Sequence, residues 1–392
     1  MIKKKNLTIF TILYLAYTSI YIARINLSIA GPELISQNVL NTVQMGLLGS
    51  VFSTVYAFGR MINGGLSDRT PPWIMLCTGL AVAGISNILT GFLPPFIGIF
   101  ILWTSNAYAQ SMLWSSVLCV VSSIYEKEEA KKKTAIMVTS VAMGNILAII
   151  INTFLITKFG VRFAFLVPGG LTLVFGLALL ITARGVSLPP SDKSKHISML
   201  SMLKNKQILS MGVPAVFHGV MKENISLWMA VYIVDRYCVD LSTSSYYILL
   251  IPFIGFIGRT VYPAVYKLCK NRENTVSLAG FAVCILSSVL LCVNKINITV
   301  AMLSLSAIYA AVSMINTSIL SIFPLHYVKT GNVASISGVM DFATYLGGGV
   351  ASFIYGIVIK YWGYTPMFVS WLVISLISLI FLYKINKSEN EE

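Results

Sequence analysis

The feature that most limits the fold of this chain is a series of long apolar stretches that recurs over its whole length of 392 residues. Most are at least as long as the roughly 20 residues that a helix needs to cross the hydrocarbon core of a bilayer. They are rich in Leu, Ile, Gly and Ala and lack the alternation of barrel strands. The mean hydropathy is +0.81 and only 11% of the residues are charged, which excludes an ordinary soluble domain. We therefore predict an all-α polytopic membrane protein.

Twelve transmembrane helices fit this pattern. The first is predicted to be retained, because its apolar run continues to about Ala30 without a small-residue cleavage site. Helices rather than strands follow from the length of the runs. The predicted spans are 7–32, 44–66, 74–93, 95–124, 134–157, 161–183, 207–235, 244–268, 276–293, 297–326, 333–359 and 363–384.

The charge distribution predicts the orientation in the membrane. The chain has 28 Lys and Arg residues and a formal charge of +14. Most of these residues fall in one alternate set of loops and at the termini, so the positive-inside rule places both termini in the cytoplasm of a cell with this protein in its plasma or inner membrane. A basic charge distributed in this way indicates contact with the lipid bilayer and argues against nucleic acid as a partner.

Motifs for catalysis, metals and cofactors are missing from the sequence. The six cysteines stand singly without a C-x-x-C pair, which argues against a disulfide framework and a metal site. There is no P-loop, no H-E-x-x-H and no G-x-S-x-G. We expect a protein that is not an enzyme and uses no cofactor.

The chain divides into two halves that repeat each other. The longest hydrophilic segment runs from residue 184 to residue 206, which predicts an N-terminal bundle 1–184, a cytoplasmic linker 185–206 and a C-terminal bundle 207–392 with a short tail. Arg24-Ile25-Asn26-Leu27-Ser28 recurs as Lys222-Glu223-Asn224-Ile225-Ser226, at an offset of 198 (222 − 24). With six helices in each half, both bundles have the same orientation, as in parallel repeats.

Further matches support a real duplication. Gly59-Arg60 recurs as Gly258-Arg259 at an offset of 199. Met137, Gly144 and Gly160 recur as Met340, Gly347 and Gly363, all at an offset of 203.

The repeated segments each carry a cation inside a membrane span. A cation there costs roughly 2.5–3.5 kcal/mol, so it is rarely kept without a partner, a wet cavity or a ligand. Two such cations at matching places predict a shared site near the midplane of the membrane, where a small anion offsets the repulsion between Arg24 and Lys222.

Several motifs carry a resemblance to a known family. Gly64-Gly65-Leu66-Ser67-Asp68-Arg69 resembles the G-x-x-x-D-[R/K] loop of the major facilitator superfamily. The following Thr70-Pro71-Pro72, Tyr21-x-x-Arg24-x-Asn26-x-x-x-Ala30-x-Pro32, and Ser337-Gly338 with Tyr345-Leu346-Gly347-Gly348 are similar to the organophosphate:phosphate antiporters, the glycerol-3-phosphate and hexose-phosphate transporters. The resemblance extends over nearly the whole chain and implies two pseudo-symmetric six-helix bundles.

The resemblance also implies a set of ligands for substrate phosphate, namely Arg24, Lys222 and Arg60. Two positions depart from the family pattern. Lys222 stands where the family has arginine, and Val138-Thr139-Ser140 stands where those transporters have a histidine. Lysine binds phosphate as a point charge without the bidentate fork of arginine.

Other side chains near these cations are candidates for the substrate site. Tyr21 and Tyr56 lie about one turn from Arg24 or Arg60, and Tyr17 lies about two turns from Arg24. Phenols at these places could donate hydrogen bonds to phosphate, although bundle packing explains them as well. Asn26 accompanies Arg24 in the repeat. His218 precedes Lys222 by one turn and either replaces the missing histidine or is an ordinary interior residue. The polar residues Asn106, Gln110, Ser111, Asn316 and Thr317 are expected to form interhelical hydrogen bonds or line a cavity.

A second set of charged residues is predicted to form a gating network. Asp68 and Arg69 belong to the conformational loop, and Arg259 is expected to be a structural charge. Asp341 and Glu223 are the carboxylates that lie well inside spans, as gating salt bridges or as proton carriers. Asp341 is an alternative partner of Lys222 or Arg60, whereas Glu223 points some 100° away from Lys222 and is not expected to form an ideal pair with it.

We expect a secondary transporter that exchanges an organophosphate for inorganic phosphate by alternating access and acts as a monomer. Two alternatives stay open at this point. One is an anion:proton symporter of the same fold, and the other is a membrane sensor that binds a phosphorylated sugar without transporting it. A multidrug exporter is disfavoured, because efflux of hydrophobic cations has no use for buried positive charge.

Overall fold

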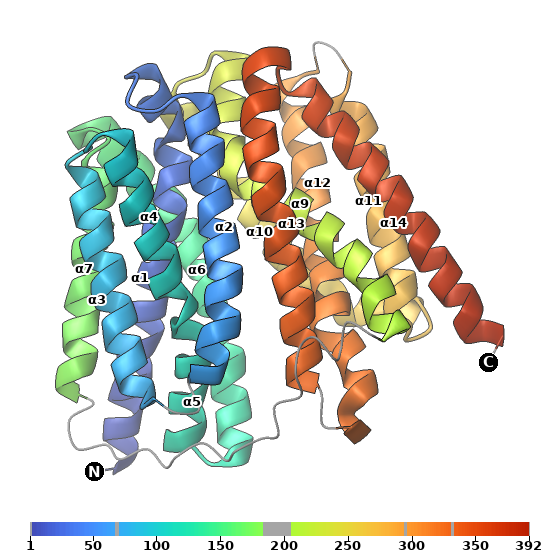
Figure 1. Cartoon of the computed structure of the whole chain (residues 1–392), viewed down its shortest axis with the longest axis horizontal. Helices are drawn as coiled ribbons and strands as arrows, with labels where there is room; N and C mark the ends of the chain where they lie inside the picture. Colours follow the sequence, from blue (N-terminus) through green and yellow to red (C-terminus); the bar gives the residue numbers. More distant parts are fainter. Residues whose placement is uncertain (1, 67–69, 183–204, 294–295, 331–332, 392) are drawn as a thin grey trace. The chain divides into compact units, whose positions relative to one another are not determined.

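The computed structural model describes residues 2–66, 70–182, 205–293, 296–330 and 333–391. Every regular element in these ranges is a helix, so the all-α prediction is confirmed. Figure 1 labels the helices along the chain. Their bounds are α1 Ile2–Ser36, α2 Thr42–Leu66, α3 Pro72–Gly91, α4 Phe96–Ser111, α5 Leu113–Ile124, α6 Lys127–Phe159, α7 Phe163–Thr182, α9 Lys206–Tyr237, α10 Leu241–Leu268, α11 Glu273–Leu291, α12 Ile298–Thr317, η1 Ser318–Ile322, η2 Phe323–Thr330, α13 Val333–Trp362 and α14 Thr365–Glu391.

Eleven stretches in the described part of the chain are long and apolar enough to span a membrane. The twelfth predicted span, 207–235, is the helix α9, which is 32 residues long. Its middle carries His218, Lys222, Glu223 and Asn224, which interrupt its apolar sequence. The multi-pass architecture is thus confirmed.

Two predicted spans are interrupted in the structure. The span predicted at 95–124 is divided into α4 and α5 at Met112. The span predicted at 297–326 ends as an α-helix at Thr317 and continues as a π-helical turn and a 3₁₀ segment. The side-chain oxygen of Ser337 donates to the backbone carbonyl of Leu320 within that π-helical turn, 2.7 Å away. Periodicity alone does not reveal such breaks, since the apolar run continues through them.

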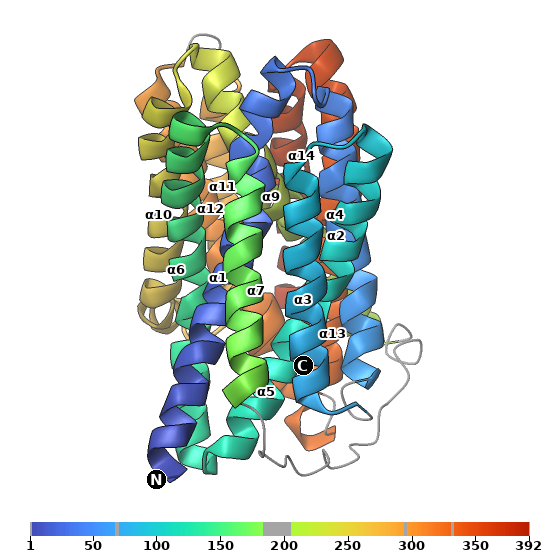
Figure 2. The ribbon, with the colours of Figure 1, turned by 90° about the vertical axis from the view of Figure 1, so that its left-hand side faces the viewer.

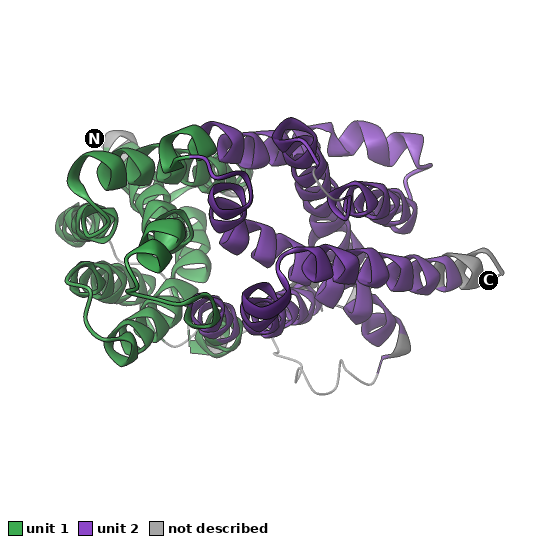
Figure 3. Ribbon diagram, turned by 90° about the horizontal axis from the view of Figure 1, so that it is seen from above, with its two compact units in different colours: residues 1–44, 55–194, 240–245 green, residues 45–54, 195–239, 246–392 purple. Residues whose placement is uncertain are grey.

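The chain forms two compact units (Figure 3). Unit 1 comprises residues 1–44, 55–194 and 240–245, and unit 2 comprises residues 45–54, 195–239 and 246–392. The two units are therefore not simply the first and second halves of the chain, because residues 45–54 of α2 belong to unit 2. The predicted linker, 185–206, lies outside the described residues except for its last two, and the domain boundaries predicted around it stay a prediction.

Inside each unit the repeated residues make the same helix contacts. In unit 1, α1 packs against α6 and α7, and α3 packs against α7 (Figure 2). A Cβ added to Gly144 of α6 would lie 2.9 Å from the carbonyl oxygen of Thr18 in α1. A Cβ added to Gly347 of α13 would lie 2.6 Å from the carbonyl oxygen of Val216 in α9. Thr18 and Val216 are themselves offset by 198, so the duplication predicted from the sequence extends to the packing.

The repeated turns also match. Gly160 follows α6 with φ +99°, and Gly363 follows α13 with φ +74°. An L side chain rarely adopts such a backbone conformation, so glycine ends the helix at each of these two positions. The offset of 203 that the sequence showed therefore marks a helix end at a glycine with positive φ in both units.

Candidate functional site

The first cluster of candidate residues lies in unit 1, where Arg24 of α1 and Arg60 of α2 share one aromatic ring. The guanidinium carbon of Arg24 is 4.5 Å from the ring centroid of Tyr56 and 5.7 Å from that of Tyr21. The guanidinium carbon of Arg60 is 5.9 Å from the same Tyr56 ring. These four predicted residues are therefore brought together, and we call them the arginine cluster.

Tyr17 completes this cluster one turn before Tyr21. The ring centroids of Tyr17 and Tyr21 are 5.6 Å apart in an edge-on arrangement, and Tyr17 also packs on Trp114 of α5 at 5.3 Å. Tyr17 lies near enough to Arg24 and Arg60 to interact with both electrostatically. The sequence prediction missed Trp114, because nothing in the pattern of α5 distinguishes it from a packing residue.

The arginine cluster has the chemistry of an anion site. Both guanidiniums are only partly buried, whereas Tyr17 and Tyr56 are buried beneath them. A cation over an aromatic face is stabilised by about 0.5 to 2 kcal/mol, which helps to hold each guanidinium against the Tyr56 ring. Guanidinium groups bind carboxylate and phosphate through two parallel hydrogen bonds.

Asn26 has a different role from the one predicted. Its side-chain amide donates to the side-chain oxygen of Asn87 at 2.8 Å and to the backbone carbonyl of Ala164 at 2.9 Å. Its own oxygen accepts from the backbone N–H of Leu27. These hydrogen bonds join α1 to α3 and α7. The side chain is fully buried, so it is not available to a substrate in this structure.

The repeat partner of Asn26 supports this correction. Asn224 of α9 is fully buried and donates to the backbone carbonyl of Gly348 in α13 at 3.3 Å and to that of Val220 at 2.8 Å. The asparagine of the repeated motif is therefore structural in both units.

The second cluster lies in unit 2 around Lys222 of α9. Its ammonium nitrogen is 3.1 Å from a carboxylate oxygen of Glu223 and 4.8 Å from the ring centroid of Tyr345 in α13. Asp341 and Tyr309 also interact with Lys222 electrostatically. The expectation that Glu223 could not pair with Lys222 was wrong, because two long side chains bend towards each other although their Cβ atoms diverge on the helix.

His218 lies one helical turn before Lys222 on α9 and near enough to interact with it electrostatically. It is fully buried. Its ring nitrogens lie near the backbone carbonyls of Ala215 and Val312 without reaching good hydrogen-bond geometry, and Arg259 is near enough to interact electrostatically. A substrate could reach this imidazole only if the surrounding helices moved, so its predicted contact with substrate stays untested.

The remaining predictions concern two residues and several polar groups. Asp68 and Arg69 lie outside the described residues. Asn63 of α2 donates to Ser111 of α4 at 2.8 Å, which is the interhelical hydrogen bond expected for Ser111. Gln110 donates to Asn106 at 3.0 Å within α4, so this bond does not join two helices.

A comparison with known sequence families decides the class of the protein. The sequence model of the Major Facilitator Superfamily matches residues 13–352 of the chain. The chain belongs to the Major Facilitator Superfamily. This membership confirms the resemblance that the loop and helix motifs indicated.

Known superfamily members agree in sequence and in fold. The chain is 25% identical to the "Probable hexose phosphate transport protein" of Chlamydia trachomatis, over 97% of this chain and 91% of that one. It is 23% identical to the "Glycerol-3-phosphate transporter" of Bacillus subtilis, over 97% and 92%. It is 26% identical to the "Membrane sensor protein UhpC" of Escherichia coli, over 64% and 62%. The fold matches the solved structure of the nucleoside transporter NupG with a TM-score of 0.80 at 13% identity, covering 97% of this chain and 98% of that one.

The protein is thus a multi-pass membrane transporter of the superfamily, related to sugar phosphate and glycerol-3-phosphate transporters, and not an enzyme. Arg24 lies on α1 and Lys222 on α9, at matching positions of the sequence repeat.

Proposed function

We propose that this transporter exchanges a phosphate monoester, a sugar phosphate or a glycerol phosphate, for inorganic phosphate by alternating access. The observation that carries the proposal is the arginine cluster, in which Arg24 and Arg60 share the ring of Tyr56 inside a membrane bundle. Guanidinium pairs favour phosphate, and relatives named for hexose phosphate and glycerol-3-phosphate support the ester.

The proposed ligands of the phosphate group are Arg24, Arg60 and Lys222, with hydroxyl donors from Tyr17, Tyr21 and Tyr56. Lys222 is included because it is the repeat partner of Arg24. Asp341 and Arg259 are proposed to act in gating, and a single chain is proposed to be sufficient, because it holds both copies of the repeat. When no anion is bound, the positive charges disfavour movement of the empty carrier, which is the physical basis of obligatory exchange.

Counterflow into proteoliposomes tests the exchange. Vesicles loaded with inorganic phosphate should take up radiolabelled glucose 6-phosphate or glycerol 3-phosphate, and empty vesicles should take up at least about tenfold less, because the return step needs an anion. Carboxylates without phosphate should compete poorly. Equal uptake into loaded and empty vesicles would rule out obligatory exchange.

The similarity to UhpC favours a second candidate, a membrane sensor of a phosphorylated sugar. A sensor binds the ester without net flux. Binding of glucose 6-phosphate to the purified protein, combined with no counterflow in reconstituted vesicles, would establish this role in place of transport.

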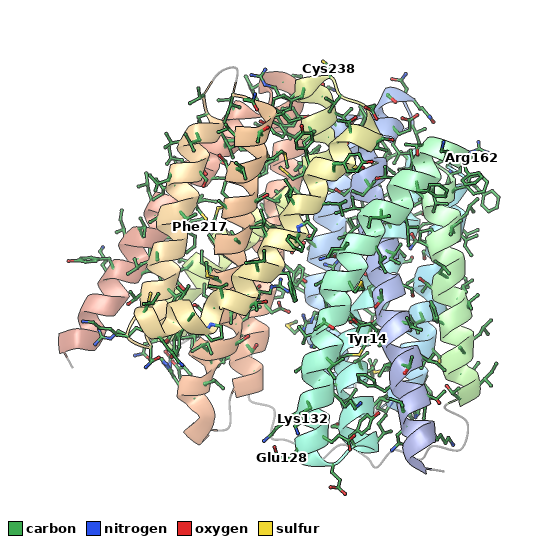
Figure 4. All side chains as sticks on the ribbon, turned by 180° about the vertical axis from the view of Figure 1, so that it is seen from behind. Tyr14, Glu128, Lys132, Arg162, Phe217 and Cys238 are labelled. Carbon is green, nitrogen blue, oxygen red and sulfur yellow. The ribbon has the colours of Figure 1, made fainter. Side chains whose placement is uncertain are left out.

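The orientation in the membrane is also a proposal. In unit 1, Glu128 and Lys132 lie at the end that carries the N-terminus, and Arg162 lies at the opposite end (Figure 4). The basic segment at the start of α6 thus supports a cytoplasmic N-terminus by the positive-inside rule, in a plasma or inner membrane.

This orientation predicts the side on which Cys238 reacts. Cys238 follows α9 in a left-handed conformation and is exposed (Figure 4). We expect a membrane-impermeant maleimide to label Cys238 in intact cells, whereas Cys269, which follows α10, should react only after permeabilisation. The Cys238→Ser variant should lose the label. Labelling of Cys269 in intact cells would reverse the proposed orientation.

A further inference from the structure

The ion pair of Lys222 with Glu223 lies inside a membrane span, next to a proposed substrate ligand. The ammonium nitrogen and the carboxylate oxygen are 3.1 Å apart, and the two side chains are 19% and 14% exposed. A carboxylate at this distance occupies one of the three donors of the ammonium group. An anion that binds Lys222 therefore meets a negative charge that is already in contact with the same cation.

The helix packing fixes the pair in this position. The stem of Glu223 lies against Gly348 of α13, where an added Cβ would be 2.5 Å from its Cγ atom. Lys222 lies over the ring of Tyr345 on the same helix. Because both stems are held by α13, neither side chain can simply swing out of the span to avoid an incoming anion.

Other titratable and charged groups lie near the pair or near His218, one turn away on α9. They are His218 on α9, Arg259 on α10, Tyr309 on α12, and Asp341 and Tyr345 on α13. An unperturbed imidazole titrates near pH 6.5 and an unperturbed phenol near pH 10. Glu223 is in direct contact with the ammonium group, so an anion at Lys222 meets the charge of this carboxylate at short range.

We propose that Glu223 competes with the substrate for Lys222 and takes up a proton when the phosphate ester binds. Protonation removes the negative charge of Glu223, leaves the ammonium group to the phosphate and avoids repulsion between the carboxylate and the dianion. The inference rests on the proposed function, because it needs an anion at Lys222. It assigns to the carrier a coupling between proton and anion that exchange for phosphate does not require.

The sign of the pH dependence follows from linkage. If the ester binds preferentially to the protonated state of Glu223, binding of the ester takes up a proton, and affinity falls as pH rises by at most about tenfold per pH unit for one proton. A carrier that keeps this proton through its transport step is driven by a pH gradient. Exchange of ester for phosphate at equal pH on both sides is still possible.

The test measures binding of glucose 6-phosphate to the purified full-length protein between pH 7.0 and 8.5. The second pKa of a phosphate ester is near 6, so the ligand is mostly a dianion in this range. We expect the wild-type affinity to fall several-fold from pH 7.0 to 8.5, and a pH indicator in weak buffer to report uptake of up to about one proton per bound ester. The Glu223→Gln variant should bind with a flat pH profile and more tightly than wild type at pH 8.5.

Three further variants sharpen the result. Glu128→Gln removes the carboxylate of an exposed pair with Lys131, 2.8 Å apart, and should keep the wild-type profile. Asp341→Asn should also keep the slope, and a flat profile in this variant alone would assign the proton to Asp341 and overturn the proposal. Lys222→Ala should abolish the pH dependence together with most of the affinity.

Several outcomes would contradict the inference. Ester binding by wild-type protein without proton uptake would overturn it even if Glu223→Gln failed to fold. A Glu223→Gln variant that binds less tightly at every pH with an unchanged slope would make Glu223 a structural residue. No binding of the ester at any pH would overturn the proposed function, and a bound ester with no pH dependence would overturn the proton coupling alone.

Discussion

Uptake of a phosphate monoester is expected to fall at least about a hundredfold when Arg24 is replaced with alanine. Hydrogen bonds to a charged group contribute about 1.5 to 3 kcal/mol each, and a bidentate guanidinium makes two of them. Each 1.4 kcal/mol changes a binding constant tenfold. Initial rates of counterflow over a range of ester concentrations will separate this loss of affinity from a loss of protein.

Two variants control for charge and for position. Arg24→Lys keeps the positive charge over Tyr56 but loses the fork, so it should retain part of the uptake. Arg162→Ala removes an exposed arginine at the end of unit 1 and should transport normally. If the Arg24→Ala variant took up the ester as fast as wild type, the arginine cluster would be excluded from the substrate site.

A variant with both Arg24→Ala and Lys222→Ala measures the coupling between the two cations. If both bind one anion, the free energy of binding lost in the double variant should be smaller than the sum of the losses in the single variants.

Replacing Gly219 with alanine is expected to prevent normal assembly of unit 2. A Cβ at this position would collide with the backbone carbonyl of Thr344 in α13. Backbone atoms cannot rotate away as a side chain can, so the two helices would have to separate, at a cost of about 3 kcal/mol or more. The measurements are the yield of monodisperse protein after detergent extraction and its melting temperature.

The same helix supplies the matched control. An added Cβ at Gly212 of α9 meets nothing within 4 Å. Gly212→Ala should leave the protein unchanged or slightly more stable, because alanine is the better helix former by about 1 kcal/mol. If both variants gave the same yield and melting temperature, the close approach of α9 to α13 would not limit stability.

Much of the fold could be predicted because the bilayer requires long apolar helices. The sequence repeat further indicated that these helices form two similar bundles. The breaks at Met112 and Thr317 were missed. An apolar sequence does not reveal whether its backbone hydrogen bonds follow an α, π or 3₁₀ pattern. That pattern depends on contacts with neighbouring helices, such as the hydrogen bond from Ser337 to the carbonyl of Leu320.

The sequence could indicate which candidate residues lie together when they are costly to bury, because a cation inside a span needs a compensating contact or ligand. Arg24 and Arg60 do share the ring of Tyr56 in the structure, and their role in binding substrate stays a prediction. The sequence alone could not distinguish a substrate ligand from a residue that joins helices at Asn26. Its three hydrogen bonds in the structure indicate that it joins helices. The pairing of Lys222 with Glu223 was missed because Cβ directions on a helix do not limit where long side chains end.

The contact between α9 and α13 has a consequence for the transport cycle. Gly219 and Gly347 bring the two backbones together, and the Glu223 stem fills the space beside Gly348, so sliding one helix along the other would drive atoms into each other. We therefore expect the two helices to move together as one rigid body. Opening and closing of the carrier would then depend on other contacts of the protein.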